Sequence, residues 1–68
     1  MDEKIVIFRR NGILYMTTEE NYNSIIPNAS LLTRLEGFDT YDEVVGYLWK
    51  WKKIPKNHII NNTDKRDW

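Results

Sequence analysis

Cysteine is absent from this 68-residue chain, histidine occurs only at position 58, and there are only three glycines and two prolines. Without cysteine no disulfide can form, and one histidine without a thiolate is too little for a zinc site. No apolar run approaches the ~20 residues of a membrane span, and the residues after Met1 lack the basic and apolar regions of a secretory signal. We therefore expect a cytoplasmic protein with no membrane association, no metal and no cofactor.

The length permits one domain. Hydrophobic residues make up 41% and aromatic residues 13% of the chain, a composition typical of a folded protein. A single core of this size rarely supplies more than roughly 3–5 kcal/mol, so good packing or oligomerisation must supplement it. We expect one domain over residues 1–62 and a flexible tail over residues 63–68.

The formal net charge is zero, but acidic and basic residues are distributed unevenly along the chain. Residues 1–45 carry four basic and eight acidic side chains, a balance of −4, whereas residues 46–68 carry six basic and two acidic side chains, a balance of +4. Such an arrangement can steer an anionic partner, or it can let two copies of the chain attract each other. The balance alone does not choose between these alternatives.

The N-terminal third predicts a β-hairpin. Residues 4–10 and 13–18 are rich in β-branched and aromatic side chains, and Asn11-Gly12 between them suits a two-residue type I′ turn. The turn sets a register that pairs Arg10 with Ile13, Phe8 with Tyr15, and Val6 with Thr17. Because both faces of the hairpin are apolar, we expect a helix on one face and a second copy of the chain on the other.

The polar residues 19–29 predict a loop or one irregular helical turn, and the loop is favoured. Thr17 and Glu20 have the spacing of a capping box, but the asparagines and serine that follow are poor helix formers. Residues 30–36 predict a third strand that ends at Gly37. Residues 58–60 form a short apolar patch, and whether they pair as an edge strand is left open.

A helix is predicted over residues 41–52. Thr40 and Glu43 form a capping box, and Pro55 cannot continue the helix. Apolar residues recur at helical spacing at Tyr41, Val44, Val45, Leu48 and Trp51. The fold class is therefore α+β: a three-stranded antiparallel sheet, made of the hairpin and a third strand, packed on one helix, with the C-terminal edge strand as the open addition. Gly46 inside the helix suggests a close approach of two backbones.

Aromatic and basic side chains alternate in "GYLWKWKKIP", residues 46–55. Trp51 is assigned to the core, whereas Tyr47 and Trp49 fall on the flanks of the helix, where another element must cover them. Alternatively, Trp49 is a tryptophan exposed without a binding role, and the lysines only solvate the end of the helix and interact favourably with its dipole. The candidate binding residues are Tyr47, Trp49, Lys50, Lys52 and Lys53.

Enzyme chemistry has little support in this sequence. His58 is the sole candidate general base, and a lone histidine in a polar segment is usually a surface residue. The sequence has no glycine-rich phosphate loop and no nucleophile elbow. We expect no enzymatic activity.

The runs "LEGFDTYDEVVGYLWKWKKIPKNHII" and "KIVIFRRNGILYMTT" resemble the YopT-type family, small uncharacterised proteins of a Bacillus prophage. The resemblance covers most of the chain but contains no motif of known chemistry. It implies a bacterial homodimer whose subunit has one helix and three strands, with no established activity and no functional residues to transfer.

The function predicted first is a homodimeric protein–protein interaction module that binds a host or phage protein. The alternative is a nucleic-acid-binding accessory protein that places its helix-end lysines and Lys56 on phosphates and Trp49 on a base. The zero net charge and the sequence pI of 6.6 speak against this alternative, because nucleic-acid-binding domains are usually strongly basic.

Overall fold

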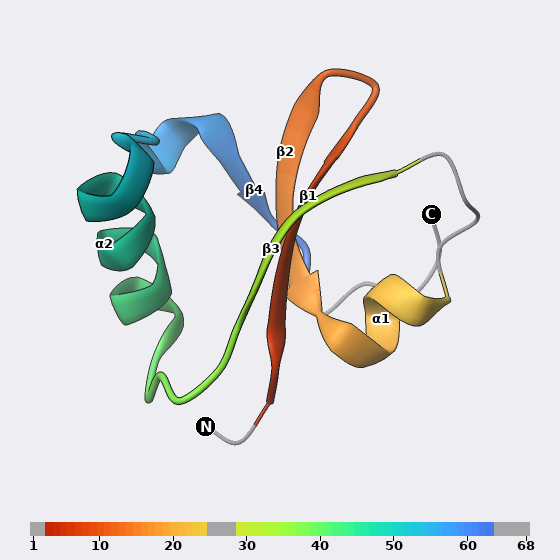
Figure 1. The fold of residues 1–68 in the computed structure, drawn as a ribbon, viewed down its shortest axis with the longest axis horizontal. Helices are drawn as coiled ribbons and strands as arrows, with labels where there is room; N and C mark the ends of the chain where they lie inside the picture. Colours follow the sequence, from red (N-terminus) through yellow and green to blue (C-terminus); the bar gives the residue numbers. More distant parts are fainter. Residues whose placement is uncertain (1–2, 25–28, 64–68) are drawn as a thin grey trace.

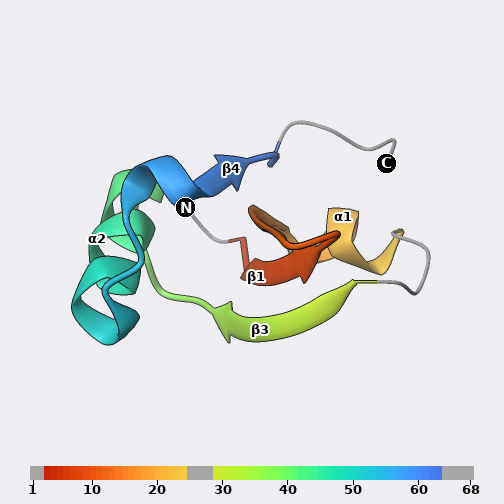
Figure 2. The same ribbon diagram turned by 90° about the horizontal axis from the view of Figure 1, so that it is seen from above.

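The computed structural model describes residues 3–24 and 29–63. A four-stranded sheet lies between two helices, which are on opposite sides of it (Figures 1 and 2). The elements in chain order are β1 (Ile5–Arg10), β2 (Ile13–Thr18), α1 (Glu19–Asn23), β3 (Ser30–Leu35), α2 (Tyr41–Lys52), the 3₁₀ turn η1 (Lys56–His58) and β4 (Ile59–Asn61).

The predicted hairpin is confirmed with its register. β1 and β2 are antiparallel, with Phe8 opposite Tyr15 and Val6 opposite Thr17. Asn11 and Gly12 have φ values of 54° and 79°, as a type I′ turn requires at both central positions. This register turns Ile5, Ile7 and Met16 to one face of the sheet, where they form the core.

The sheet has four strands and is mixed. Its strand order is β3-β1-β2-β4, with β3 antiparallel to β1 and β4 parallel to β2. The three predicted antiparallel strands are present, and the open question about residues 58–60 is answered by the short edge strand β4, whose parallel pairing was not predicted. A parallel return to β2 requires a long crossover. Here the crossover runs from β2 through α1, β3 and α2.

Helix α2 begins and ends where the sequence predicted. Its N-cap is Thr40, whose hydroxyl accepts a hydrogen bond from the Glu43 backbone N–H at 3.3 Å, and the Glu43 carboxylate accepts one from the Asp39 backbone N–H at 3.0 Å. Val44 and Leu48 are fully buried against the core face of the sheet. Leu32, Leu35, Phe38 and Ile54 pack around this cluster.

The segment after the hairpin, where the sequence favoured a loop over one helical turn, begins with a short helix, α1 (Glu19–Asn23). The N-cap is Thr18, one residue beyond the threonine of the apparent capping box, and its hydroxyl accepts from the Asn21 backbone N–H at 3.1 Å. Tertiary contacts outweigh the low helix propensity: Tyr22 packs its ring 5.4 Å from that of Phe8. The rest of the predicted loop, residues 25–28, lies outside the described residues.

Helix α1 covers the second face of the sheet. Val6 and Phe8 are fully buried there, and Phe8 also stacks on Tyr15 with 5.3 Å between ring centroids. Arg34 of β3 contacts Glu19 at 3.3 Å and lies 6.0 Å from the ring of Tyr22. The cover on this face thus comes from the same chain, where we expected a second copy.

Buried hydrogen bonds connect the end of β4 to this second face. The Asn62 backbone N–H donates to the Met16 carbonyl at 2.8 Å, and the Asn21 side chain donates to the Thr63 carbonyl at 2.8 Å. Asn21, Asn62 and Thr63 are all buried. Thr63, the first residue of the predicted tail, is thus held against α1 by the hydrogen bond from Asn21. The remainder of that predicted tail, residues 64–68, lies outside the described residues.

Candidate protein interface

The outward side of α2 holds the candidate binding residues. At about 100° per residue, Gly46 lies almost opposite the buried Val44 and Leu48 and so marks the middle of the outer side. The exposed residues of α2 and its C-cap, which we call the outer face below, are Asp42, Glu43, Gly46, Tyr47, Trp49, Lys50, Trp51, Lys52 and Lys53.

An aromatic row runs along one flank of the outer face and consists of Phe38, Tyr47 and Trp51. Tyr47 meets Phe38 edge-on at 5.6 Å and stacks on Trp51 at 6.0 Å, with 22° between the ring planes. Tyr47 is 38% and Trp51 39% exposed. The assignment of Trp51 to the core is therefore wrong. The fully buried residues of α2 are Val44 and Leu48, and the Trp51 ring stacks on Tyr47 instead.

Trp49 lies on the opposite flank and is 50% exposed. Its position is linked to the end of the helix, where Lys53 adopts a left-handed conformation with φ 55° and donates its backbone N–H to the Trp49 carbonyl at 2.9 Å. This C-cap turns the Lys53 ammonium back over the Trp49 ring, at 5.2 Å from its centroid. In the same way the Lys52 ammonium lies 5.0 Å from the centre of the Trp51 ring.

A shallow groove of about 360 Å³ lies between the aromatic row and the charged residues. Its lining consists of Phe38, Glu43, Gly46, Tyr47 and Lys50. Gly46 forms part of its floor, because a Cβ built there would meet no atom within 4 Å. The expectation that another backbone segment of the same chain approaches Gly46 closely is therefore wrong. Because glycine has no side chain, this position leaves a groove open at the surface.

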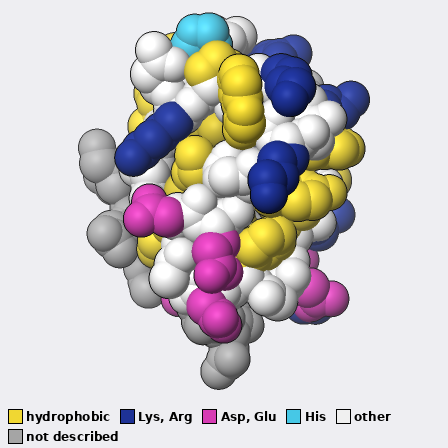
Figure 3. Space-filling view, turned by 90° about the vertical axis from the view of Figure 1, so that its left-hand side faces the viewer, with side chains coloured by type: hydrophobic (Ala, Val, Ile, Leu, Met, Phe, Trp, Pro, Cys, Tyr) yellow, Lys and Arg dark blue, Asp and Glu magenta, His cyan; other side chains and the backbone are white. Residues whose placement is uncertain are grey.

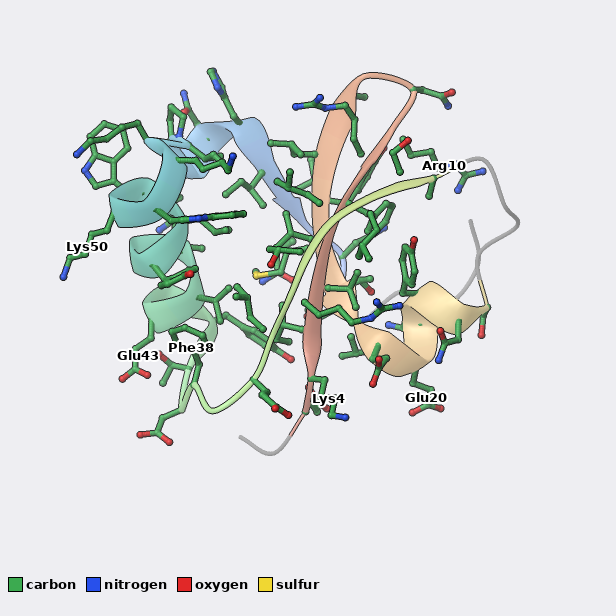
Figure 4. The ribbon with its side chains drawn as sticks, viewed as in Figure 1. Lys4, Arg10, Glu20, Phe38, Glu43 and Lys50 are labelled. Carbon is green, nitrogen blue, oxygen red and sulfur yellow. The ribbon has the colours of Figure 1, made fainter. Side chains whose placement is uncertain are left out.

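Charge on the outer face is divided by sign along the helix axis. Acidic residues occupy the first turn, at Asp42 and Glu43, and basic residues occupy the last turn, at Lys50 and Lys52. In the space-filling view of this side, acidic side chains gather at the lower half and basic ones at the upper half, with apolar side chains between them (Figure 3). Glu43 and Lys50 both project away from the sheet (Figure 4).

Four of the five candidate binding residues lie on α2 and Lys53 is its C-cap, with Tyr47 and Trp49 on opposite flanks as their positions in the sequence indicate. The structure adds residues that the sequence reasoning missed: Phe38, which precedes the helix, and Glu43 and Gly46, which were assigned only structural roles. The i, i+4 spacing of Tyr47 and Trp51, with Phe38 before the N-cap, is the signal that could have indicated the aromatic row.

The described residues contain no cluster of three or more histidine, cysteine, aspartate or glutamate side chains able to hold a metal. No helix among them is both long and apolar enough to span a bilayer. His58 is exposed within η1, at the end of α2 opposite to the acidic turn.

Comparison with known proteins finds no matching family model, no matching curated protein and no matching solved structure. The resemblance to YopT-type proteins, the prophage origin that it implies and the cytoplasmic location stay predictions.

Proposed function

We propose that the protein is a homodimeric protein–protein interaction module and that the outer face of α2 is its interface. The observation that carries this proposal is the exposure of three large aromatic side chains, Tyr47, Trp49 and Trp51, on one short helix that is anchored to the sheet by the fully buried Val44 and Leu48. Aromatic side chains are enriched at protein interfaces because they bury a large area at low conformational cost.

Protein is a better match to this face than nucleic acid. A phosphate backbone laid along α2 would meet the lysines at one end but the carboxylates of Asp42 and Glu43 at the other. The ammonium groups of Lys52 and Lys53 also lie over the indole rings, so a base could stack on those ring faces only after these contacts break.

The size of the face sets the expected affinity. Twelve residues make α2 about 18 Å long, so a contact made mainly by this helix buries less than the ~800 Å² per partner of a standard interface. We expect dissociation in the micromolar range, at which a dilution series resolves monomer from dimer.

Sedimentation velocity over a dilution series tests the proposal with the variants Tyr47→Ala and Trp49→Ala. Each removes an exposed aromatic side chain of the outer face, and we expect each to weaken self-association about tenfold or more, as interface aromatics commonly do. Ile13→Ala is the matched control, because Ile13 is 43% exposed at the hairpin turn, away from α2.

Two results would contradict the proposal. A wild-type chain that stays monomeric at high micromolar concentration has no homodimer interface, and two variants that dimerise like the wild type place the interface elsewhere. The same runs with a short single-stranded DNA added test the alternative: co-sedimentation that weakens as salt rises would assign the outer face to nucleic acid.

A further inference from the structure

We propose that two copies pair through α2 in antiparallel orientation, about a two-fold axis that passes between Gly46 and Tyr47. In this arrangement Glu43 of each subunit faces Lys50 of the partner subunit. The inference rests on the proposed function, and it adds the occupant of the groove and the pairing of its residues.

The order of charges along the outer face is the first argument. The acidic first turn and the basic last turn lie on opposite sides of Gly46 at similar distances: Glu43 is three residues before it and Lys50 four residues after it, or about 5 and 6 Å along the axis. A two-fold rotation perpendicular to two antiparallel helices exchanges their ends. It therefore brings each acidic turn against a basic turn, twice in one dimer.

The position of these charges around the helix is the second argument. At about 100° per residue, Glu43 and Lys50 lie on the same side of Gly46, about 60° and 40° from it, and both line the groove. An antiparallel two-fold pair keeps each residue on its own side of the contact, so these two side chains meet across it. On the other side, Asp42 of one helix lies level with the segment between Trp49 and Lys53 of the partner subunit.

The groove is the third argument. Tyr47 forms its rim and Gly46 part of its floor, one residue apart at the proposed axis. Because Gly46 has no side chain, the outer face of the partner subunit can approach the helix backbone closely at this point, and the same approach follows by symmetry in the other direction. A parallel pair lacks this complementarity, because it places like charges opposite each other at both ends of the helix.

Charge reversal tests the pairing. Lys50→Glu places two pairs of like charges in the homodimer, and Glu43→Lys does the same with the opposite sign. We expect each variant alone to self-associate roughly tenfold or more weakly than the wild type, because two attractive contacts become repulsive. An equimolar mixture of the two variants restores attraction at both contacts, so we expect a heterodimer with wild-type-like affinity.

Two further variants separate the effect of charge on dimerisation from an effect on folding. Glu43 also accepts the hydrogen bond from Asp39, so Glu43→Gln retains an acceptor without the charge, and circular dichroism reports the helix content of every variant. The double variant Glu43→Lys/Lys50→Glu carries complementary charges again and is expected to dimerise like the wild type.

The outcomes distinguish a failure of the antiparallel pairing from a failure of the proposed homodimer. If the wild type dimerises but the mixture associates no more tightly than the single variants, the antiparallel pairing is wrong and the homodimer stands. If the single variants dimerise as tightly as the wild type, these two side chains do not face each other. If the wild type remains monomeric, both the pairing and the proposed homodimer are overturned.

Discussion

The inner and outer faces of α2 differ in composition and in exposure. The inner face presents the aliphatic Val44 and Leu48, which are fully buried against the sheet. The outer face presents Tyr47, Trp49 and Trp51, whose side chains remain between 38% and 50% exposed. The two tryptophans of this helix and Tyr47 are thus left exposed to solvent, whereas Tyr41 packs against the core.

This contrast separates folding from association. Burial of the aliphatic residues stabilises the subunit, because their apolar surface is removed from water when the chain folds. The aromatic residues are covered only in part by one another and by lysine side chains. The favourable free energy of covering the rest is therefore available to a binding partner.

Leu48→Ala is the largest expected perturbation of the inner face. Leu48 is fully buried between α2 and the sheet, so the substitution leaves a cavity and is expected to lower the free energy of unfolding by about 2–5 kcal/mol. Urea denaturation monitored by circular dichroism measures the change. Trp49→Ala, on the outer face of the same helix, is the control and is expected to change stability by about 0.5 kcal/mol or less. Equal losses in the two variants would contradict the division between the faces.

The elements that local sequence signals specify were the ones predicted from the sequence. Asn11-Gly12 fixed the turn and hence the hairpin register, and the Thr40 cap with Pro55 beyond the end fixed the bounds of α2. Helix α1 could not be predicted in this way. It depends on Tyr22 against Phe8 and on Asn21 against Thr63, contacts between residues far apart in the chain.

The residues of the candidate site could be predicted from the sequence, but their arrangement in space could not. Alternating aromatic and basic residues indicated that Tyr47, Trp49 and the lysines share one helix end. The left-handed C-cap at Lys53 and the contact of Phe38 with Tyr47 depend on backbone conformation beyond the helix. Trp51 was misplaced because helical spacing gives the direction of a side chain but not the width of the buried strip.

Thr40→Ala perturbs the N-terminal end of α2 without changing a residue of either face. It removes the hydroxyl that accepts from the Glu43 backbone N–H, and we expect a loss of about 1 kcal/mol in the free energy of unfolding. Thermal denaturation measures the loss, and Thr40→Ser, which retains the hydroxyl, should recover most of it. If serine is no better than alanine, the cap does not stabilise the helix.

Gly46→Ala is expected to change stability less than Leu48→Ala, and in the opposite direction. A Cβ at this position meets no atom within 4 Å, so the methyl group adds helix propensity without strain and is expected to raise the free energy of unfolding by roughly 0.5–1 kcal/mol. Urea denaturation at a concentration where the chain is monomeric measures this gain. A decrease would mean that the middle of the outer face packs against another part of the same chain, and it would remove the basis for treating the groove as a surface open to a partner. An increase accompanied by weaker dimerisation would sharpen the contrast between the faces, because the methyl group that favours the helix would then occupy space that the partner subunit needs.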